Sequence, residues 1–294
     1  MNCINDTEVV LATATRKIKV LNLDTMTVTR VFEGKLCRYG SRMEIIKDGK
    51  EILTLMQGKH GFKTYNIESG RTVSLIHAPS EIRESKHNMF DQYSLVINNI
   101  NLMACNIGYE GPHLIVVFDY LQNVCVRILR AYSHYSTFLG AYLSQDCSYL
   151  PVNTYKSFPH PIIEGKMNSV SCIVVYNIEQ GKITHWCLDQ DLYNTYAREG
   201  ELEKMEVDNA ILLDDDRLVT SSEDSILRVW NIRTGELIKR LEGHKVLPKL
   251  VKNHEKSPYF VTMANFGEEN SLRMWDKKTL TCVAMYRLDH KLIL

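Results

Sequence analysis

The sequence predicts an all-β fold built from six copies of one four-stranded unit. A marker recurs along the 294 residues: an apolar-alternating run ends in a bulky residue, and Asn or Asp follows it. Successive markers lie 44, 53, 58, 54 and 45 residues apart. A turn and a second alternating run follow most markers, as in a β-hairpin. A repeat of this length, rich in strand signals, is typical of a radial or stacked architecture. The markers are Leu21-Asn22, Tyr65-Asn66, Phe118-Asp119, Tyr176-Asn177, Trp230-Asn231 and Trp275-Asp276.

Each unit is justified by the runs around its marker, in chain order. The first has strands at 9–14, 17–22 and 27–32, with only 1–4 left for its first strand, and the sixth has a poor first strand before 258–264, 271–276 and 282–288. The other four units have four runs each. These runs are 41–47, 51–56, 61–66 and 71–77; 93–99, 100–106, 114–119 and 125–130; 137–144, 149–155, 171–177 and 182–188; and 205–213, 217–222, 225–231 and 236–241. An ordinary β-sandwich, the alternative, predicts no such in-phase recurrence.

The repeat favours one domain over 1–294 rather than two. All-β closed folds often exceed about 200 residues as a single domain. An apolar content of 45% is enough for a large core, and a charged content of 24% is ordinary for a soluble protein. The approximate units, or blades, are 1–36, 37–79, 91–135, 136–193, 203–246 and 247–294.

Charge and cysteine usage narrow the functional classes. Lys plus Arg and Asp plus Glu both total 35, so the formal net charge is zero. This removes the broad basic surface expected of a nucleic-acid binder. The eight cysteines form no C-x-x-C pair, which favours buried free thiols and a reducing, cytoplasmic setting. The N-terminus does not resemble a signal peptide, and no apolar run approaches the ~18 residues of a membrane helix, so we expect no membrane insertion.

The residues 218–245, LVTSSEDSILRVWNIRTGELIKRLEGHK, carry a Trp-Asp-like dipeptide and a Gly-His. With this paired signature the chain resembles the WD-repeat β-propeller family, best over 217–245 and 259–290. The resemblance implies four-stranded blades arranged radially around a central channel. It also implies a structural hydrogen-bond network that satisfies a buried indole N–H. The implied network residues are Ser222, Asp224 and Trp230 in the fifth blade, and His244, Thr262 and Trp275, with Glu269 nearby, in the sixth.

The first four copies depart from the family pattern. They replace Trp by Leu, Tyr, Phe and Tyr, and none has a Gly-His in place. The ends are also unusual, because 240–247 is echoed by 287–294. Two explanations fit: Lys291–Leu294 pairs with the first blade and closes a six-bladed ring, or the chain is a piece of a larger array of seven or more blades. An unpaired blade edge is a liability that rings normally remove.

Three stretches are longer than the repeat requires: 77–91, 153–169 and 188–204. Family geometry places all three on one face of a propeller, and long loops in a compact domain are usually functional or disordered. The middle stretch is aromatic and stiffened by Pro159 and Pro161, which suits a contact surface. The candidate partner-binding residues on these loops are Tyr155, Phe158, His160, Arg83, Lys86, Tyr193, Tyr196 and Arg198.

No catalytic, cofactor or metal motif stands out. There is no H-E-x-x-H, no Cys/His spacing suited to zinc, no G-x-G-x-x-G or P-loop and no G-x-S-x-G. Asp214–Asp216 lies between two expected strands, which favours a solvated turn over a metal site. We therefore expect no catalytic residues, no cofactor, no metal and no small-molecule substrate.

The leading hypothesis is a non-enzymatic platform that binds a protein or peptide partner through its loop-rich face, within a larger intracellular complex or multidomain protein. Two alternatives stay open. A propeller enzyme would need His or carboxylate residues at the mouth of the channel. A binder of nucleic acid or phospholipid would need a local basic patch, such as Arg16-Lys17 or Arg83 to Lys86.

Overall fold

The computed structural model divides the chain into two compact units. The first comprises 1–97 and 103–130, and the second comprises 98–102 and 131–294. The single domain expected over 1–294 stays a prediction. The described residues are 2–13, 17–32, 43–46, 49–55, 61–77, 90–97, 102–107, 114–119, 121–122, 124–130, 132, 144, 146, 148–250, 257–266 and 269–287.

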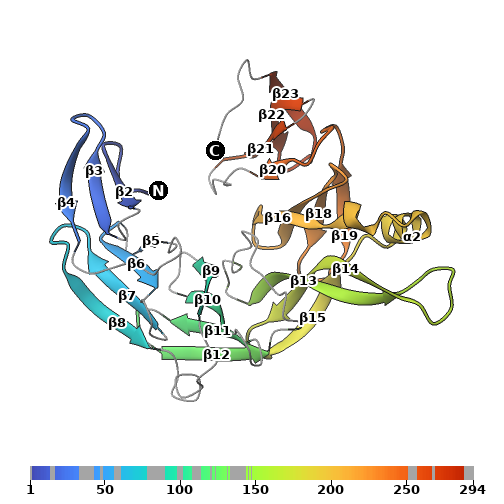
Figure 1. Ribbon diagram of the computed structural model, residues 1–294, viewed down its shortest axis with the longest axis horizontal. Coiled ribbons are helices and arrows are strands. Elements are labelled where there is room, and N and C mark those ends of the chain that lie inside the picture. Colours follow the sequence, from blue (N-terminus) through green and yellow to red (C-terminus); the bar gives the residue numbers. More distant parts are fainter. Residues whose placement is uncertain are drawn as a thin grey trace. The chain divides into compact units, whose positions relative to one another are not determined.

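The first unit contains three four-stranded sheets, in which strands consecutive in the chain are neighbours (Figure 1). The first sheet is β1 (Asn2–Cys3), β2 (Glu8–Ala12), β3 (Ile18–Asn22) and β4 (Thr27–Val31). The second is β5 (Met43–Ile46), β6 (Glu51–Leu55), β7 (Gly61–Asn66) and β8 (Thr72–His77). The third is β9 (Phe90–Ile97), β10 (Leu102–Ile107), β11 (Leu114–Asp119) and β12 (Val124–Arg130).

The second unit contains one three-stranded and two four-stranded sheets. The three-stranded sheet is β13 (Tyr149–Pro159), β14 (Met167–Asn177) and β15 (Lys182–Cys187). After it come the helix α2 (Gln190–Glu199) and the short 3₁₀ helix η1 (Leu202–Met205). The remaining sheets are β16 (Val207–Leu212), β17 (Arg217–Ser222), β18 (Leu227–Asn231) and β19 (Leu237–Leu241), and β20 (Lys249–Leu250), β21 (Tyr259–Phe266), β22 (Glu269–Asp276) and β23 (Cys282–Arg287).

The marker has a structural cause that all six sheets share. The strand that carries the marker pairs with the next strand through a β-bulge, and the bulge falls at the marker residue in every sheet. The following Asn or Asp then accepts backbone N–H groups from the turn two or three residues further on. The bulky residue and its polar follower are therefore the start of one recurring hairpin turn.

The same turn also explains the glycines after the marker. Four residues beyond the Asn or Asp, the backbone has a positive φ at Gly70, Gly181 and Gly235, a conformation that glycine adopts without strain. Met26 and Leu280 occupy the same place in the first and last sheets with φ of 53°. These two turns have the same positive φ although glycine, the residue that adopts it without strain, is absent there.

The core of each unit lies between neighbouring sheets. In the first unit, one cluster joins Val10, Val20 and Phe32 of the β1–β4 region to Ile52 and Tyr65 of the β5–β8 sheet. In the second unit, a corresponding cluster joins β14 and β15 to β16–β18, and another joins β16–β19 to the β20–β23 sheet. Stacked blades bury both faces of their central strands, which explains why β14 is buried at every position from Val170 to Asn177.

Within the described residues, the structure is an all-β propeller fold with five four-stranded blades, which corrects the predicted count of six. The fourth expected blade has three described strands, because all of its expected first strand (137–144) except Ser144 lies outside the described residues. The expected insertion 153–169 is also not a plain loop: most of it continues β13 and β14, which are 11 residues long each. The insertion 188–204 folds as α2 and η1.

Two further predictions fall partly or wholly outside the description. The structure describes the stretch 77–91 only at its two ends. Arg83 and Lys86 belong to this stretch but are not among the described residues. The proposed closing strand, Lys291–Leu294, is likewise outside the described residues. The weak first strands expected in the first and sixth units are present as β1 and β20, of two residues each.

Candidate interaction surface

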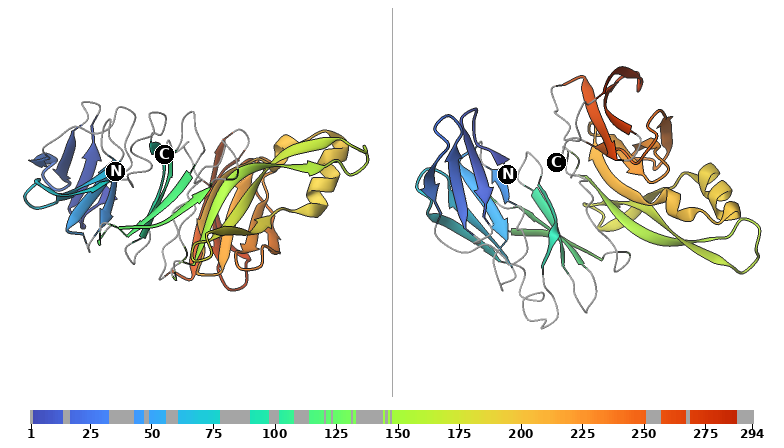
Figure 2. Two further views of the ribbon diagram at one scale, coloured as in Figure 1. Left: turned by 90° about the horizontal axis from the view of Figure 1, so that it is seen from below. Right: turned by 45° about the horizontal axis from the view of Figure 1, so that its top comes forward.

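The two insertions of the second unit fold together as one element, which we call the hairpin–helix projection (residues 154–172 and 189–206). β15 pairs with β14 only from Ile173 to Asn177, so the distal parts of β13 and β14 form a two-stranded ribbon that runs on beyond the sheet. Figures 1 and 2 show this ribbon with α2 beside it. The two insertions, which are separated in the sequence by the rest of β14 and by β15, therefore lie together in space.

Local signals define α2 within the second insertion. Asp189 is the N-cap, and its side chain accepts the Leu192 N–H. Gly200 ends the helix in the left-handed conformation, with φ of 76°. The helix turns Tyr193 and Ala197 to the inside, so its inner face is short and its outer face is polar. A capped helix of this kind needs a partner surface for its buried face, and the ribbon provides it.

The projection has its own small core. Tyr193 and Ala197 of α2 pack with Val170 of β14 and Met205 of η1, and the half-buried Phe158 lies against them. The Tyr193 ring centre is 5.6 Å from that of Phe158. Its hydroxyl donates to the backbone carbonyls of Phe158 at 3.2 Å and Pro159 at 2.7 Å. These contacts tie the helix to the far end of the ribbon.

Further contacts tie the projection to its sheets. The Tyr155 hydroxyl donates to Glu206, and burial together with this carboxylate raises the pKa of Tyr155 to about 12. Lys156 lies over the Trp186 ring of β15, 3.8 Å from its centre, as in a cation–π contact. The Tyr196 hydroxyl lies 3.4 Å from Asp224, in the β17–β18 turn. The projection is therefore fastened to two neighbouring sheets.

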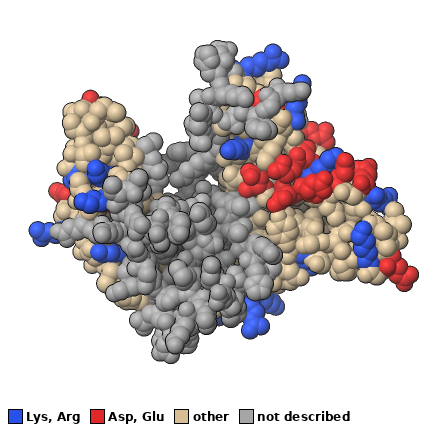
Figure 3. Space-filling view, in the orientation of Figure 1, with Lys and Arg blue, Asp and Glu red and all other residues tan. Residues whose placement is uncertain are grey.

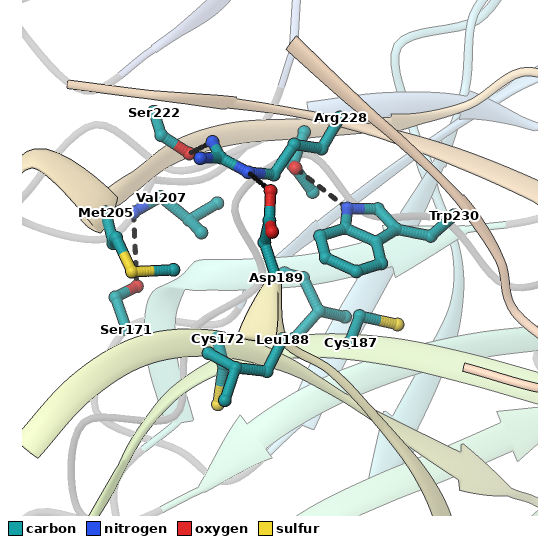
Figure 4. Close-up of a pocket in the computed structure, with 12 residues that line it drawn as sticks. Ser171, Cys172, Cys187, Leu188, Asp189, Met205, Val207, Ser222, Arg228 and Trp230 are labelled. Atoms are coloured by element: carbon teal, nitrogen blue, oxygen red, sulfur yellow. Dashed lines mark hydrogen bonds and ion pairs between the residues drawn. The ribbon is translucent and has the colours of Figure 1, made fainter. Parts of the chain in front are cut away.

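A buried ion network anchors the start of α2. Asp189 accepts from Arg228 at 3.0 Å (Figure 4). It also accepts from Arg240 at 2.6 Å, and Arg228 donates to Asp224 at 2.5 Å. The side chains of Asp189, Arg228 and Asp224 are only 1–3% exposed. Burial opposes ionisation of Asp189, but the bonds from Arg240 and Arg228 hold its pKa below the ordinary value. Buried charges persist only when they are paired in this way.

The network borders a small cavity between the β13–β15 and β16–β19 sheets (Figure 4). Its volume is about 10 Å³, and its walls include Cys172, Cys187 and Trp230. That is room for about one water molecule. Burial raises the pKa of the Cys172 thiol to about 12 and that of Cys187 further still, so neither is a reactive thiolate at neutral pH. The cavity is a packing feature rather than a substrate pocket.

The tip of the hairpin (residues 160–167) is an ordered apolar turn. The N–H groups of Ile162 and Ile163 donate to His160 Nδ1 at 3.1 and 3.0 Å. The His160 N–H in turn donates to the Lys166 carbonyl at 2.9 Å. Ile162, Ile163 and Met167 are 67%, 50% and 56% exposed. Sequence reasoning missed these three residues, although two adjacent isoleucines between a proline and a glycine are an unusual turn composition that could have found them.

The sequence-predicted contact residues therefore fall into different surroundings. Tyr193 is 1% exposed and belongs to the core of the projection. Tyr155, Phe158 and Tyr196 are half-buried and hold the projection together, while His160 caps the tip. Arg198 is exposed in the last turn of α2. The structure brings the insertions 153–169 and 188–204 together, and the expectation that all three insertions share one face of a propeller stays a prediction.

The hydrogen bonds around the two tryptophans differ between blades. In the β20–β23 sheet, the Trp275 indole donates to Thr262 at 2.8 Å, and His244 lies 2.7 Å from Thr262 and 2.9 Å from Glu269. In the β16–β19 sheet, the Trp230 indole donates to Thr220 at 3.0 Å rather than to Ser222. The strand register explains why Thr220 and not Ser222 accepts the indole bond. Thr220 lies two residues from Leu218, the partner of Trp230, whereas Ser222 lies two residues further along and accepts from Arg228.

Within the described part of the chain, no group of three or more His, Cys, Asp or Glu side chains is arranged to hold a metal ion. None of the helices described there is long and apolar enough to cross a membrane. The fold and this surface define a β-propeller that carries a projecting hairpin and helix.

Comparison with known proteins places this propeller beside WD-repeat proteins. No family model matches the chain. It is 32% identical over 65 residues to GID complex subunit 7 of Schizosaccharomyces pombe, covering 22% of this chain and 12% of that protein. It is 32% identical over 78 residues to the WD repeat-containing protein pop2 of the same yeast, covering 26% and 10%. The chain thus spans only about a tenth of each relative's length. The resemblance to WD-repeat proteins is confirmed by these relatives together with the blades.

Proposed function

We propose that the protein is a non-enzymatic scaffold that binds a protein or peptide partner through the hairpin–helix projection, inside a larger cytoplasmic complex. The observation that carries this proposal is the projection itself. Two separate insertions, 153–169 and 188–204, fold into one element with its own core and with apolar side chains exposed at its tip. The part of the ribbon beyond the β14–β15 pairing and its exposed tip are not needed to pair the strands of the sheet, so they call for another role.

The relatives support the same class of function. One of them is by name a subunit of a complex, and the other a WD-repeat protein. A rigid projection also suits recognition, because a surface that is already ordered loses little conformational entropy when it binds. The enzymatic alternative has less support, since the cavity beside Asp189 and Arg228 is too small for a substrate and its charges are paired with each other.

The test is capture of partners from a lysate with the intact chain and with a shortened variant. Residues 160–166 are replaced by Asn-Gly, which joins the paired ends Pro159 and Met167 by a two-residue hairpin turn. Thermal unfolding of both proteins checks that the shortened chain folds. We expect proteins bound by the intact chain to be lost from the shortened one.

A matched control changes the turn between β18 and β19 (residues 232–236), which is not part of the hairpin–helix projection. Glu236→Ala leaves the projection untouched and is expected to retain every partner. Partners that persist on the folded, shortened chain would overturn the proposal and move the search to other surfaces.

A further inference from the structure

The tip of the hairpin exposes more apolar surface than a turn requires. Ile162, Ile163 and Met167 lie within six residues of one another, and each is at least half exposed. Turns in proteins are normally polar, and a cluster of large exposed apolar side chains usually marks a contact with another molecule. Elsewhere in the described chain, groups of exposed apolar residues occur on the outer strands of sheets, such as Val124, Val126 and Ile128 on β12, whereas those of the tip lie on a turn that projects beyond its sheet.

The tip is also held ready for contact. His160 Nδ1 accepts two N–H groups of the turn, and the stiff Pro159 and Pro161 flank it. Tyr193 fixes the ribbon immediately before the tip by bonding two of its carbonyls. Burial of the tip by a partner would therefore gain apolar contact at little cost in ordering.

The surface at the base of the projection is acidic. Backbone bonds from Glu223 N to Glu206 O and from Asp224 N to Lys204 O place the β17–β18 turn beside η1. Acidic residues of both segments therefore share one surface, and Lys204 within it is paired with Glu201. Figure 3 shows acidic side chains gathered in a band on the face that Figure 1 presents. We define the acidic surface as Glu199, Glu201, Glu203, Glu206 and Glu223.

We propose that the projection binds a protein segment that is both apolar and basic, so that its apolar side chains cover the tip while its Lys or Arg side chains face the acidic surface. This inference rests on the proposed function and adds the chemistry of the partner. The tip itself has no net charge, because Glu164 and Lys166 carry opposite charges. The acidic surface therefore makes the charge that the projection presents to a partner negative. The same charge disfavours an anionic membrane and disfavours a second copy docked acidic face to acidic face.

The test uses the full chain and a synthetic amphipathic helix of about 18 residues, built from leucine on one face and lysine on the other. Binding is followed by fluorescence anisotropy. We expect the peptide to bind, and to bind more weakly as salt rises from about 0.05 to about 0.3 M. The tip variant Ile162→Ser/Ile163→Ser/Met167→Ser should weaken binding by about tenfold or more. The surface variant Glu199→Gln/Glu203→Gln/Glu223→Gln should weaken it several-fold and reduce its dependence on salt.

A matched variant tests whether binding of the peptide depends on the acidic surface itself or only on the net charge of the chain. Asp24→Asn/Glu68→Gln/Glu236→Gln removes three exposed acids from other places and should bind the peptide as the unaltered chain does. A helix with glutamate in place of lysine should not bind.

Four results would overturn the inference: unchanged binding by the tip variant, equal binding of the glutamate helix, tip-dependent binding to phosphatidylcholine vesicles, or tip-dependent self-association in sedimentation. In each case, lysate partners that still depend on residues 160–166 would leave the proposed function standing.

Discussion

The β16–β19 and β20–β23 blades solve one structural problem with different chemistry. In both, a Trp indole of the third strand donates to a Thr of the second strand, Trp230 to Thr220 and Trp275 to Thr262. In both, a residue from the segment before the first strand completes the arrangement. In the β20–β23 blade that residue is His244, which bonds Thr262 and Glu269. In the β16–β19 blade it is Asp189, which bonds Arg228 instead.

The comparison shows what the change of chemistry achieves. The His244 network lies within a blade and holds only that blade together. The Asp189 network also caps α2 and reaches Arg240 and Asp191, so it fastens the projection to the blade. An ion pair that is fully buried needs both partners in place. The stability of the blade and the position of the proposed binding element are therefore coupled at Asp189.

The largest expected effect comes from breaking this coupling. Asp189→Ala leaves Arg228 and Arg240 without one acceptor and removes the cap of α2, which should lower the free energy of unfolding by about 3–5 kcal/mol. Asp191→Ala is the matched control, because the Asp191 side chain is 87% exposed and contacts Arg240 only from outside, so its cost should stay below about 1 kcal/mol. Urea unfolding of both variants measures the difference. Similar losses in the two would show that the buried network does not carry the stability assigned to it.

The next largest effect is on the pH dependence of the unfolding free energy, which should differ between the networks of the two blades. Burial lowers the pKa of His244 from 6.5, although Glu269 opposes the shift, and hydrogen bonds lower the pKa of Glu269 from 4.5 to about 2 against its burial. Both folded values lie below the unfolded ones, so the unfolded chain binds more protons in acid, and stability is lost as pH falls below 6.5 and again below 4.5. The Glu269 shift alone amounts to about 3 kcal/mol near pH 2.

The check is the pH dependence of the unfolding free energy. His244→Gln should flatten the curve below pH 6.5, and Glu269→Gln should flatten it below pH 4.5. The pKa of Asp189 is also lowered, but from 3.8, so the β16–β19 network should not respond above about pH 4. An unchanged slope in both variants would rule out this origin for the acid sensitivity.

A smaller effect is expected from the shared indole bonds. Trp275→Phe and Trp230→Phe keep most of the apolar volume but remove the N–H donor, which should cost about 1–3 kcal/mol each. The loss should be greater for Trp275→Phe if the chain from Thr262 to His244 and Glu269 acts cooperatively. Thermal unfolding of the two variants side by side measures this, and equal shifts would mean that the longer chain adds nothing.

The smallest effect extends the comparison to the β5–β8 blade. Thr54 occupies the place of Thr220 and Thr262, because it lies two residues beyond Ile52, the partner of the marker Tyr65. Tyr65 has no indole N–H, and the buried Thr54 hydroxyl has no hydrogen-bond partner among the described residues. Thr54→Val should therefore raise the free energy of unfolding by about 1 kcal/mol, whereas Thr262→Val should lower it. Destabilisation by both substitutions, measured in urea, would contradict this account.

Much of the blade architecture was predictable because its causes are local. The marker positions predicted where hairpins fall, since the Asn or Asp that follows the bulky residue accepts the turn's own N–H groups. Register follows from such turns and from alternation, because a one-residue slip would reverse every side chain. The network implied for the fifth blade named Ser222 beside Trp230, whereas the indole bonds Thr220, because sequence spacing alone does not state which residue of β17 lies opposite Trp230.

The projection was predictable only in outline. The excess length of 153–169 and 188–204 was visible in the sequence, and so were the aromatic residues within them. Their roles were not, because Tyr193 looks as suited to an interface as to a core until its hydroxyl is seen on the ribbon carbonyls. The exposed Ile162 and Ile163 were overlooked for the complementary reason, since aliphatic residues are normally assigned to the interior.

By itself, the sequence determined the all-β class, the repeat and its turns, because periodic alternation and turn chemistry act over a few neighbouring residues. It also determined the resemblance to WD-repeat proteins, which the relatives and the blades confirm. Only the tertiary structure decided that two insertions form one projection, that Asp189 and Arg228 replace a histidine network, and which side chains remain exposed. Those outcomes depend on contacts between residues 35 to 51 positions apart, and burial and pairing at such separations follow from packing rather than from local pattern.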